Sequence, residues 1–319
     1  MTIQILLLLV GLGLILLGAN WLVDGSSSIA RKFGISEFVI GMTIVGIGTS
    51  TPEMVVSFIS SFNHRAAMAV GNIVGSNIFN TMLILGVTAL ISPLTITRSN
   101  LRRDIPMNIV VTLLLIFMGL KQTIFGFSTD RLNRLDGAIL LILFVLYLYN
   151  TIKKDVADEV EEGDKTKVYN VFISTIMIIG GLASLIFGGR VFIQSAEKIA
   201  LMAGLSEKFV GITILAGGTS FPELATCVVA AFKGKGQLAL GNILGSNISN
   251  ILLILGGASL IHPLSFAGLS PIDLATLLLS SLFILMSAYM FKQRKLDRIE
   301  GGILLAMEAC YMTYLIINL

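Results

Sequence analysis

The chain carries one pair of polar motifs twice, inside segments that are otherwise apolar. Residues 41–57 read GMTIVGIGTSTPEMVVS, and residues 211–227 read GITILAGGTSFPELATC. Residues 69–86 read AVGNIVGSNIFNTMLILG and residues 239–256 read ALGNILGSNISNILLILG, with 13 of 18 positions identical. Matched residues are always 170 positions apart. Such a duplication predicts two related halves that each contribute one copy of the motifs to a shared site.

The composition places these halves in a membrane. Hydrophobic residues make up 55% of the chain, charged residues only 13%, and the mean hydropathy is +0.90. Apolar runs of about 20 residues recur, and each is long enough to cross a bilayer as a helix. We predict an all-α polytopic membrane protein with ten transmembrane helices. Their approximate ranges are 3–23, 36–60, 67–91, 106–124, 133–152, 169–193, 206–232, 237–261, 272–291 and 297–318.

The distribution of basic residues predicts the orientation. With ten crossings, 7 of the 22 Lys and Arg residues fall on the side of the N-terminus and 15 on the other side. Positively charged loops stay in the cytoplasm, so both termini are expected outside it. We therefore expect a multi-pass protein of the inner (cell) membrane. The charged segment 153–168 is predicted to be a cytoplasmic linker between two five-helix repeats, 1–152 and 169–319.

The two copies of the motif enter the membrane from opposite faces. The first copy opens in the helix predicted over 36–60 and the second in the helix over 206–232, five crossings later. An odd number of crossings inverts the direction of the chain. The sequence therefore predicts inverted-topology repeats related by an axis in the membrane plane.

Each copy also contains a proline that breaks its helix. Pro52 has no N–H, so the carbonyl of Gly48 loses its usual helical partner, and Pro222 acts in the same way. Glu53 and Glu223 directly follow these prolines. Carbonyls without a partner cannot face lipid, and a cation in a polar cavity would satisfy them. The neighbouring hydroxyls come from Thr49, Ser50, Thr219 and Ser220.

The helices predicted over 67–91 and 237–261 supply further polar groups. Side chains spaced four residues apart share one face of a helix. This applies to Asn72, Ser76 and Asn80 and to their counterparts Asn242, Ser246 and Asn250. We assign Asn80 and Asn250 to the site. For Asn72, Asn77, Asn242 and Asn247 the sequence leaves two roles open, at the site or as hydrogen bonds that hold helices together.

The chemistry of this set favours a hard cation. Two carboxylates with neutral oxygen ligands balance one divalent cation or two to three monovalent cations. Ligands of this kind suit Ca²⁺ or Na⁺ better than zinc, copper or iron. A pocket that holds either Ca²⁺ or several Na⁺ ions has the property that an antiporter requires. Nothing in the sequence indicates a cofactor, a nucleic-acid partner or an obligatory protein partner.

The doubled pattern G-T-S-x-P-E and G-N-x-x-G-S-N-x-x-N resembles the α-repeats of the calcium/cation antiporter superfamily, specifically its prokaryotic sodium/calcium exchangers. The resemblance extends over essentially the whole chain. It implies a central site between the helices over 36–60, 67–91, 206–232 and 237–261. It also implies alternating access, in which the helices over 3–23 and 169–193 slide across the other eight. Several Na⁺ ions would be exchanged for one Ca²⁺.

The resemblance further implies a ligand set. Ca²⁺ would be held by the carboxylates of Glu53 and Glu223 and by the carbonyls of Thr49 and Thr219. The flanking Na⁺ sites would use Gly46, Thr49, Ser50 and Ser76 in the first repeat and Ala216, Thr219, Ser220 and Ser246 in the second. Asn80 and Asn250 would line the middle of the site.

Three alternatives remain. A proton-coupled or potassium-dependent antiporter would have the same fold, and a passive cation channel could also use buried carboxylates and broken helices. An intramembrane enzyme needs an acid–base partner or a nucleophile within the helices, yet His64 and His262 both lie at predicted loop positions. We therefore do not expect an enzyme.

We predict that transport does not require K⁺. Some prokaryotic relatives and the potassium-dependent animal exchangers have an aspartate where this chain has Asn250, so its site carries at most two negative charges. Ca²⁺ uptake driven by a Na⁺ gradient into vesicles should proceed equally well with and without K⁺. Uptake that stops without K⁺ and returns when K⁺ is added would contradict this.

Overall fold

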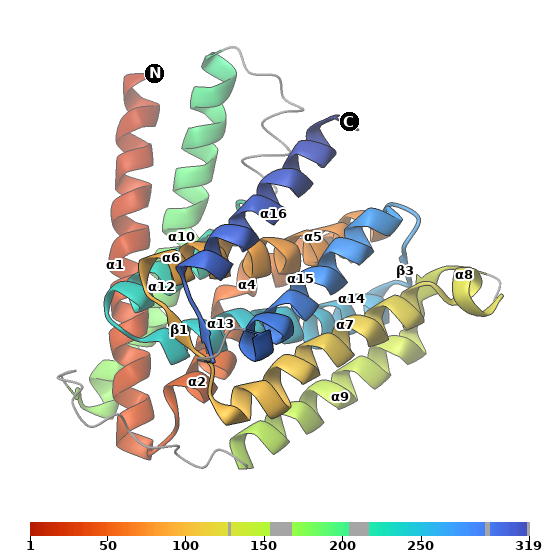
Figure 1. Cartoon of the computed structure of the whole chain (residues 1–319). Helices are drawn as coiled ribbons and strands as arrows, with labels where there is room; N and C mark the ends of the chain where they lie inside the picture. Colours follow the sequence, from red (N-terminus) through yellow and green to blue (C-terminus); the bar gives the residue numbers. More distant parts are fainter. Residues whose placement is uncertain (127–128, 154–167, 204–216, 291–293, 318–319) are drawn as a thin grey trace.

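The computed structural model describes residues 1–126, 129–153, 168–203, 217–290 and 294–317. These residues are almost entirely helical, with four strands of two residues each. Figure 1 shows one steep pair of long helices, α1 and α10, beside a bundle formed by the other elements. The predicted linker 153–168 lies outside the described residues except at its ends.

The helices of the first half follow the predicted apolar runs closely. They are α1 (Thr2–Phe33), α2 (Glu37–Ile40), the π-helix η1 (Gly41–Val45), α3 (Gly46–Thr49), α4 (Thr51–Phe62), α5 (Ala66–Phe79), the π-helix η2 (Asn80–Ile84), α6 (Leu85–Ile91), the π-helix η3 (Asn100–Asp104), α7 (Ile105–Gly119), α8 (Lys121–Phe125) and α9 (Arg134–Lys153). The strands β1 (Leu94–Thr95) and β2 (Arg131–Leu132) lie in the connections.

The second half repeats this order. Its described helices are α10 (Val171–Met202), α12 (Phe221–Phe232), α13 (Gly236–Ser249), the π-helix η5 (Asn250–Leu255), α14 (Gly256–Ile261), α15 (Pro271–Met290) and α16 (Arg298–Ile317). Its strands are β3 (Leu264–Ser265) and β4 (Lys295–Leu296). The first part of the helix predicted over 206–232 lies outside the described residues.

Among the described residues, seven helices are long and apolar enough to cross a membrane. An eighth span is possible if the bent pair Glu37–Thr49 and Thr51–Phe62 counts as one. The predicted helical membrane protein is therefore confirmed at this level. Three boundaries were wrong. The helix α1 continues ten residues beyond the predicted end at 23, and α10 continues past 193 to Met202. The helix α7 ends at Gly119, five residues before the predicted end at 124, and α8 follows it. In α1 the charge of Asp24 does not end the helix, because Lys233 pairs with it at 2.6 Å.

Glycines allow α1 and α10 to cross at close range. A Cβ on Gly18 would lie 2.7 Å from the carbonyl oxygen of Gly181, and one on Gly181 would lie 2.8 Å from the carbonyl oxygen of Gly18. Small residues at a crossing let two backbones approach in a membrane, where no hydrophobic force drives helices together. The outer faces of both helices are exposed and apolar, with Leu6 at 58% and Phe187 at 62% exposure.

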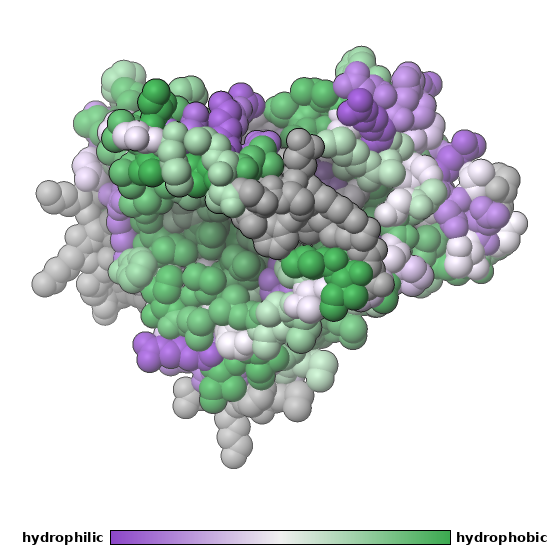
Figure 2. Space-filling model, turned by 90° about the horizontal axis from the view of Figure 1, so that it is seen from above, coloured by the Kyte–Doolittle hydropathy of each residue, from purple (hydrophilic) through white to green (hydrophobic). Residues whose placement is uncertain are grey.

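Figure 2 shows hydrophobic residues over much of one face of the molecule, with hydrophilic residues in separate patches. Exposed apolar side chains lie on nearly all the long helices. A surface of this extent is typical of a protein that contacts lipid.

The two halves are interleaved. Strand β1 pairs with β4 and β2 pairs with β3, both antiparallel, so each strand bonds to the opposite half. Glycines repeat this exchange: Gly86 packs against Gly301, and Gly256 packs against Gly137. Neither half could bury these faces alone.

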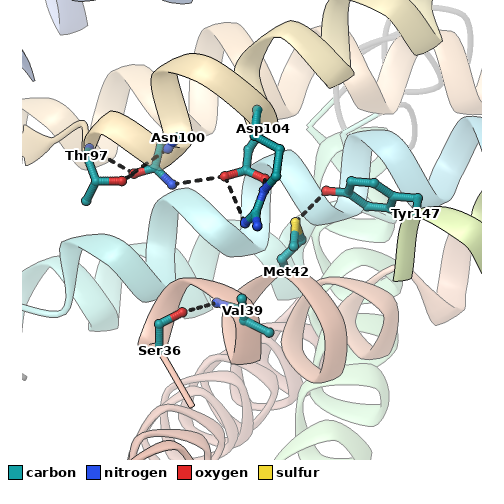
Figure 3. Close-up of polar contacts among 8 residues, drawn as sticks. Ser36, Val39, Met42, Thr97, Asn100, Asp104 and Tyr147 are labelled. Carbon is teal, nitrogen blue, oxygen red and sulfur yellow. Dashed lines mark hydrogen bonds and ion pairs between the residues drawn. The ribbon is translucent and has the colours of Figure 1, made fainter. Parts of the chain in front are cut away.

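Figure 3 shows polar contacts of α2 and η3. The hydroxyl of Ser36 accepts from the N–H of Val39 at 3.2 Å and caps α2, which leads into η1. At the two ends of η3, Asn100 accepts from the N–H of Thr97 at 2.9 Å, and Asp104 pairs with the adjacent Arg103 at 2.8 Å.

We predict that Gly18→Ala lowers the stability of the protein by about 1–3 kcal/mol, because its methyl group would overlap the backbone of α10. The matched control is Gly13→Ala, because nothing lies within 4 Å of a Cβ at that exposed position of the same helix. Thermal unfolding in detergent should separate the two variants. Equal melting temperatures would show that the crossing at Gly18 is not close.

Candidate functional site

Each motif glutamate lies in the first turn of a helix that starts at a break. Ser50 ends α3 with φ −77° and ψ 9°, and α4 begins at Thr51 with Pro52 in its first turn. The two parts of this span meet at an angle of 46°. Ser220, with φ −88° and ψ 9°, precedes α12 in the same way. Proline is well suited to the first turn of a helix because it has no N–H to satisfy.

One carbonyl at the break differs from the prediction. The Gly48 carbonyl was expected to lack a partner, but it accepts a hydrogen bond from the Thr51 hydroxyl at 2.7 Å. The Gly46 carbonyl likewise accepts from the Ser246 hydroxyl at 3.1 Å and from the Ser50 N–H at 3.2 Å. Side chains have thus replaced part of the helical bonding that Pro52 removes.

The two glutamates are held by hydroxyls from the opposite half. Both side chains are fully buried. The Ser220 hydroxyl donates to Glu53 Oε1 at 2.9 Å, and the Ser50 hydroxyl donates to Glu223 Oε1 at 3.0 Å. Ser76 adds a second donor to Glu53 Oε1 at 3.3 Å. These exchanged bonds bring the two broken helices together at one site.

The same place contains buried oxygens that accept no hydrogen bond from the described residues. They are Glu53 Oε2, Glu223 Oε2, Asn80 Oδ1 and Asn250 Oδ1. The buried Thr219 hydroxyl likewise has no hydrogen-bond partner among the described residues. Carboxylate and amide oxygens are only acceptors, and leaving them unpaired in an apolar interior is costly. Oxygens of this kind are the ligands that hard cations prefer.

The side-chain amides of Asn80 and Asn250 each donate a hydrogen bond to an asparagine of the opposite half. Asn80 Nδ2 donates to Asn247 Oδ1 at 3.2 Å, and Asn250 Nδ2 donates to Asn77 Oδ1 at 2.9 Å. Asn80 and Asn250 are the first residues of the π-helices η2 and η5. The N–H of each still bonds to the carbonyl four residues earlier, so the helical spacing of the motif is regular up to these positions. Short π-helical segments often occur at functional sites.

Ser57 and Cys227, which the sequence analysis did not assign to the site, accept hydrogen bonds from its asparagines. Asn72 Nδ2 donates to the Ser57 hydroxyl at 3.2 Å, and Asn242 Nδ2 donates to Cys227 Sγ at 3.2 Å. Residues 57 and 227 are 170 positions apart, so the repeat spacing could have identified them as a pair. Asn242 Oδ1 accepts from the Thr49 hydroxyl at 3.2 Å, which links this pair to the site.

Most of the predicted set is therefore brought together. Glu53, Glu223, Ser50, Ser220 and Ser76 are directly bonded or share one partner, and Ser246 contacts Gly46. Ala216 lies outside the described residues. Within the described part of the chain, no group of three or more His, Cys, Asp or Glu residues could hold a metal ion. The arrangement is thus two buried carboxylates, each with a neutral hydroxyl donor from the opposite half.

Comparison with known proteins agrees with this arrangement. Residues 3–153 and 173–317 match the family described as sodium/calcium exchanger protein. The sodium/calcium exchanger MaX1 of Methanosarcina acetivorans is 30% identical over 98% of this chain and 99% of its own. An uncharacterized membrane protein of Methanocaldococcus jannaschii is 40% identical over 93% of both chains. The solved structure of the sodium-calcium exchanger NCX_Mj, soaked with Na⁺ and no Ca²⁺, superimposes with a TM-score of 0.84 at 35% identity and covers 98% of this chain and 99% of that one.

The fold and the site define a helical membrane protein with a polar, carboxylate-containing interior. The chain belongs to the sodium/calcium exchanger family.

Proposed function

We propose that this protein exchanges Na⁺ for Ca²⁺ across the membrane by secondary active antiport. The observation that carries the proposal is the pair of fully buried glutamates, Glu53 and Glu223, each with one oxygen that accepts no hydrogen bond from the described part of the chain. The exchangers named among its relatives support the choice of ions.

The charge of the site explains why the two ions compete. Two carboxylates are neutralised by one Ca²⁺ or by two Na⁺ ions, and an excess of buried positive charge is strongly disfavoured. Entry of Na⁺ therefore expels Ca²⁺. Na⁺ and Ca²⁺ are the transported substrates, and we propose no cofactor and no catalytic chemistry.

We assign Ca²⁺ to the carboxylates of Glu53 and Glu223 and the carbonyls of Thr49 and Thr219. Na⁺ would bind on either side of it. The flanking ligands are Gly46, Thr49, Ser50 and Ser76 in one half and Ala216, Thr219, Ser220 and Ser246 in the other, with Asn80 and Asn250 between them. The Gly46 carbonyl already accepts hydrogen bonds from Ser50 and Ser246, so Na⁺ binding there would displace at least one of them.

We further propose ten transmembrane helices arranged as two inverted repeats. The exchanged pairing of the strands and of the glycine contacts supports a two-fold relation between the halves. The termini lie toward the same side in Figure 1, in keeping with an even number of crossings. The protein would lie in the cell membrane with both termini on the side away from the cytoplasm. The close α1–α10 pair is the element we expect to slide during alternating access.

We predict that the purified protein in liposomes accumulates ⁴⁵Ca²⁺ when an outward Na⁺ gradient is imposed. Replacing the Na⁺ gradient with a K⁺ or H⁺ gradient should give only background uptake. Uptake that ignores the Na⁺ gradient would indicate a passive channel, and uptake driven by H⁺ would indicate proton coupling. Either result would contradict the proposal.

We predict that Glu53→Gln and Glu223→Gln each abolish Ca²⁺ exchange, because either variant leaves one carboxylate to balance a divalent ion. Glu308→Gln is the matched control, since Glu308 is also buried, in α16, and lies outside the motif helices. It should retain most of the activity. Normal exchange by either motif variant would remove that glutamate from the site.

A further inference from the structure

Asn77 and Asn247, which follow the serines of the second motif, each accept a hydrogen bond from an asparagine of the opposite half. Asn77 Oδ1 accepts from Asn250 Nδ2 at 2.9 Å, and Asn247 Oδ1 accepts from Asn80 Nδ2 at 3.2 Å. All four side chains are at most 2% exposed. Each bond therefore crosses between the repeats inside a dry interior.

These bonds determine which end of each amide reaches the site. An asparagine amide has a donor end and an acceptor end, and rotating the amide by 180° exchanges them. Because the donor ends of Asn80 and Asn250 are occupied across the interface, their acceptor ends are left without a hydrogen bond, as observed. A reversed amide would present an N–H group to a cation, which is repulsive.

The acceptors are themselves fixed. Asn77 Nδ2 donates to the main-chain carbonyl of Asn247 at 3.0 Å, and Asn247 Nδ2 donates to the Thr81 hydroxyl at 2.8 Å. The residue that corresponds to Thr81 in the other half is Ile251, which has no such group. The bracing of the amides is therefore asymmetric, and Asn247 takes part in more bonds than Asn77.

We propose that Asn77 and Asn247 are positioning residues, which act in trans by turning the carbonyl oxygens of Asn250 and Asn80 toward the transported cations. This inference rests on the proposed function and assigns these residues a role that does not require them to touch an ion. It also couples the two repeats, since neither half can orient its own site asparagine.

Double-mutant cycles in proteoliposomes test the proposal through the apparent KM for Ca²⁺. Asn80→Ala and Asn247→Ala should each raise this KM about tenfold, the loss expected for one polar bond to an ion. The double variant should be no worse than either single variant, because both remove the same oxygen from the site. The pair Asn250→Ala and Asn77→Ala should behave in the same way.

The pairs within one helix, Asn77 with Asn80 and Asn247 with Asn250, are the matched controls. In these pairs the fold-change in KM of the double variant should be close to the product of the two single fold-changes, because the members of each pair act on different oxygens. Fold-changes that multiply in the trans pairs as well would overturn the proposal and return Asn77 and Asn247 to a purely structural role.

A milder substitution covers the case in which the alanine variants fold poorly. Thr81→Val keeps the side-chain shape but frees the Asn247 amide, so it should raise the KM for Ca²⁺ in the wild-type background and not in Asn80→Ala. Ile251→Val, at the matching buried position, should leave the KM unchanged. A Thr81→Val effect that persists in Asn80→Ala would contradict the inference. If the wild type itself shows no Na⁺-dependent uptake, the proposed function fails instead.

Discussion

The structure depends on placing two carboxylates in an apolar interior with hydroxyl donors and no basic residue in their own helices. Glu53 and Glu223 each take their donor from the opposite half, through Ser220 and Ser50. A buried charge is tolerated only when it is hydrogen-bonded and balanced. The serines donate to one oxygen of each carboxylate, and the other oxygen accepts no hydrogen bond from the described residues. The broken helices, the interleaved strands and the close glycine contacts all serve to bring these two groups to one place.

The two halves are similar but not identical, and the differences lie beside the site. Ser57 corresponds to Cys227, and each accepts a hydrogen bond from the asparagine that follows the first glycine of G-N-x-x-G-S-N in its own half, Asn72 or Asn242. Thr81 corresponds to Ile251, so the amide of Asn247 has a hydroxyl partner in the opposite half and the amide of Asn77 has none. The ion pair between Asp24 and Lys233 ties α1 to the end of α12, and the positions that correspond to these residues in the other half are neutral.

Much of this could be predicted from the chain alone. The hydropathy runs located the span Ala66–Ile91 (α5, η2 and α6), α9 and α16 to within one residue at each end. The site glutamates and serines followed from the proline-broken motif. The ends of α1 and α10 were wrong because both helices continue beyond the predicted apolar runs, and in α1 the charge of Asp24 pairs with Lys233 at the end of α12. The Gly48 carbonyl was read as unpaired because hydroxyl bonds within a break have no sequence signal.

The sequence by itself determined the membrane class, the duplication and the identity of the paired carboxylates. These properties follow from hydrophobicity, spacing and residue type, which the chain states directly. Only the tertiary structure decided which serine binds which glutamate and that Asn80 and Asn250 begin π-helical segments. It also decided that Asn77 and Asn247 accept hydrogen bonds from Asn250 and Asn80 of the opposite half. A hydrogen bond between residues about 170 positions apart depends on a few tenths of an ångström and on the rotation of one amide, and no local pattern encodes either.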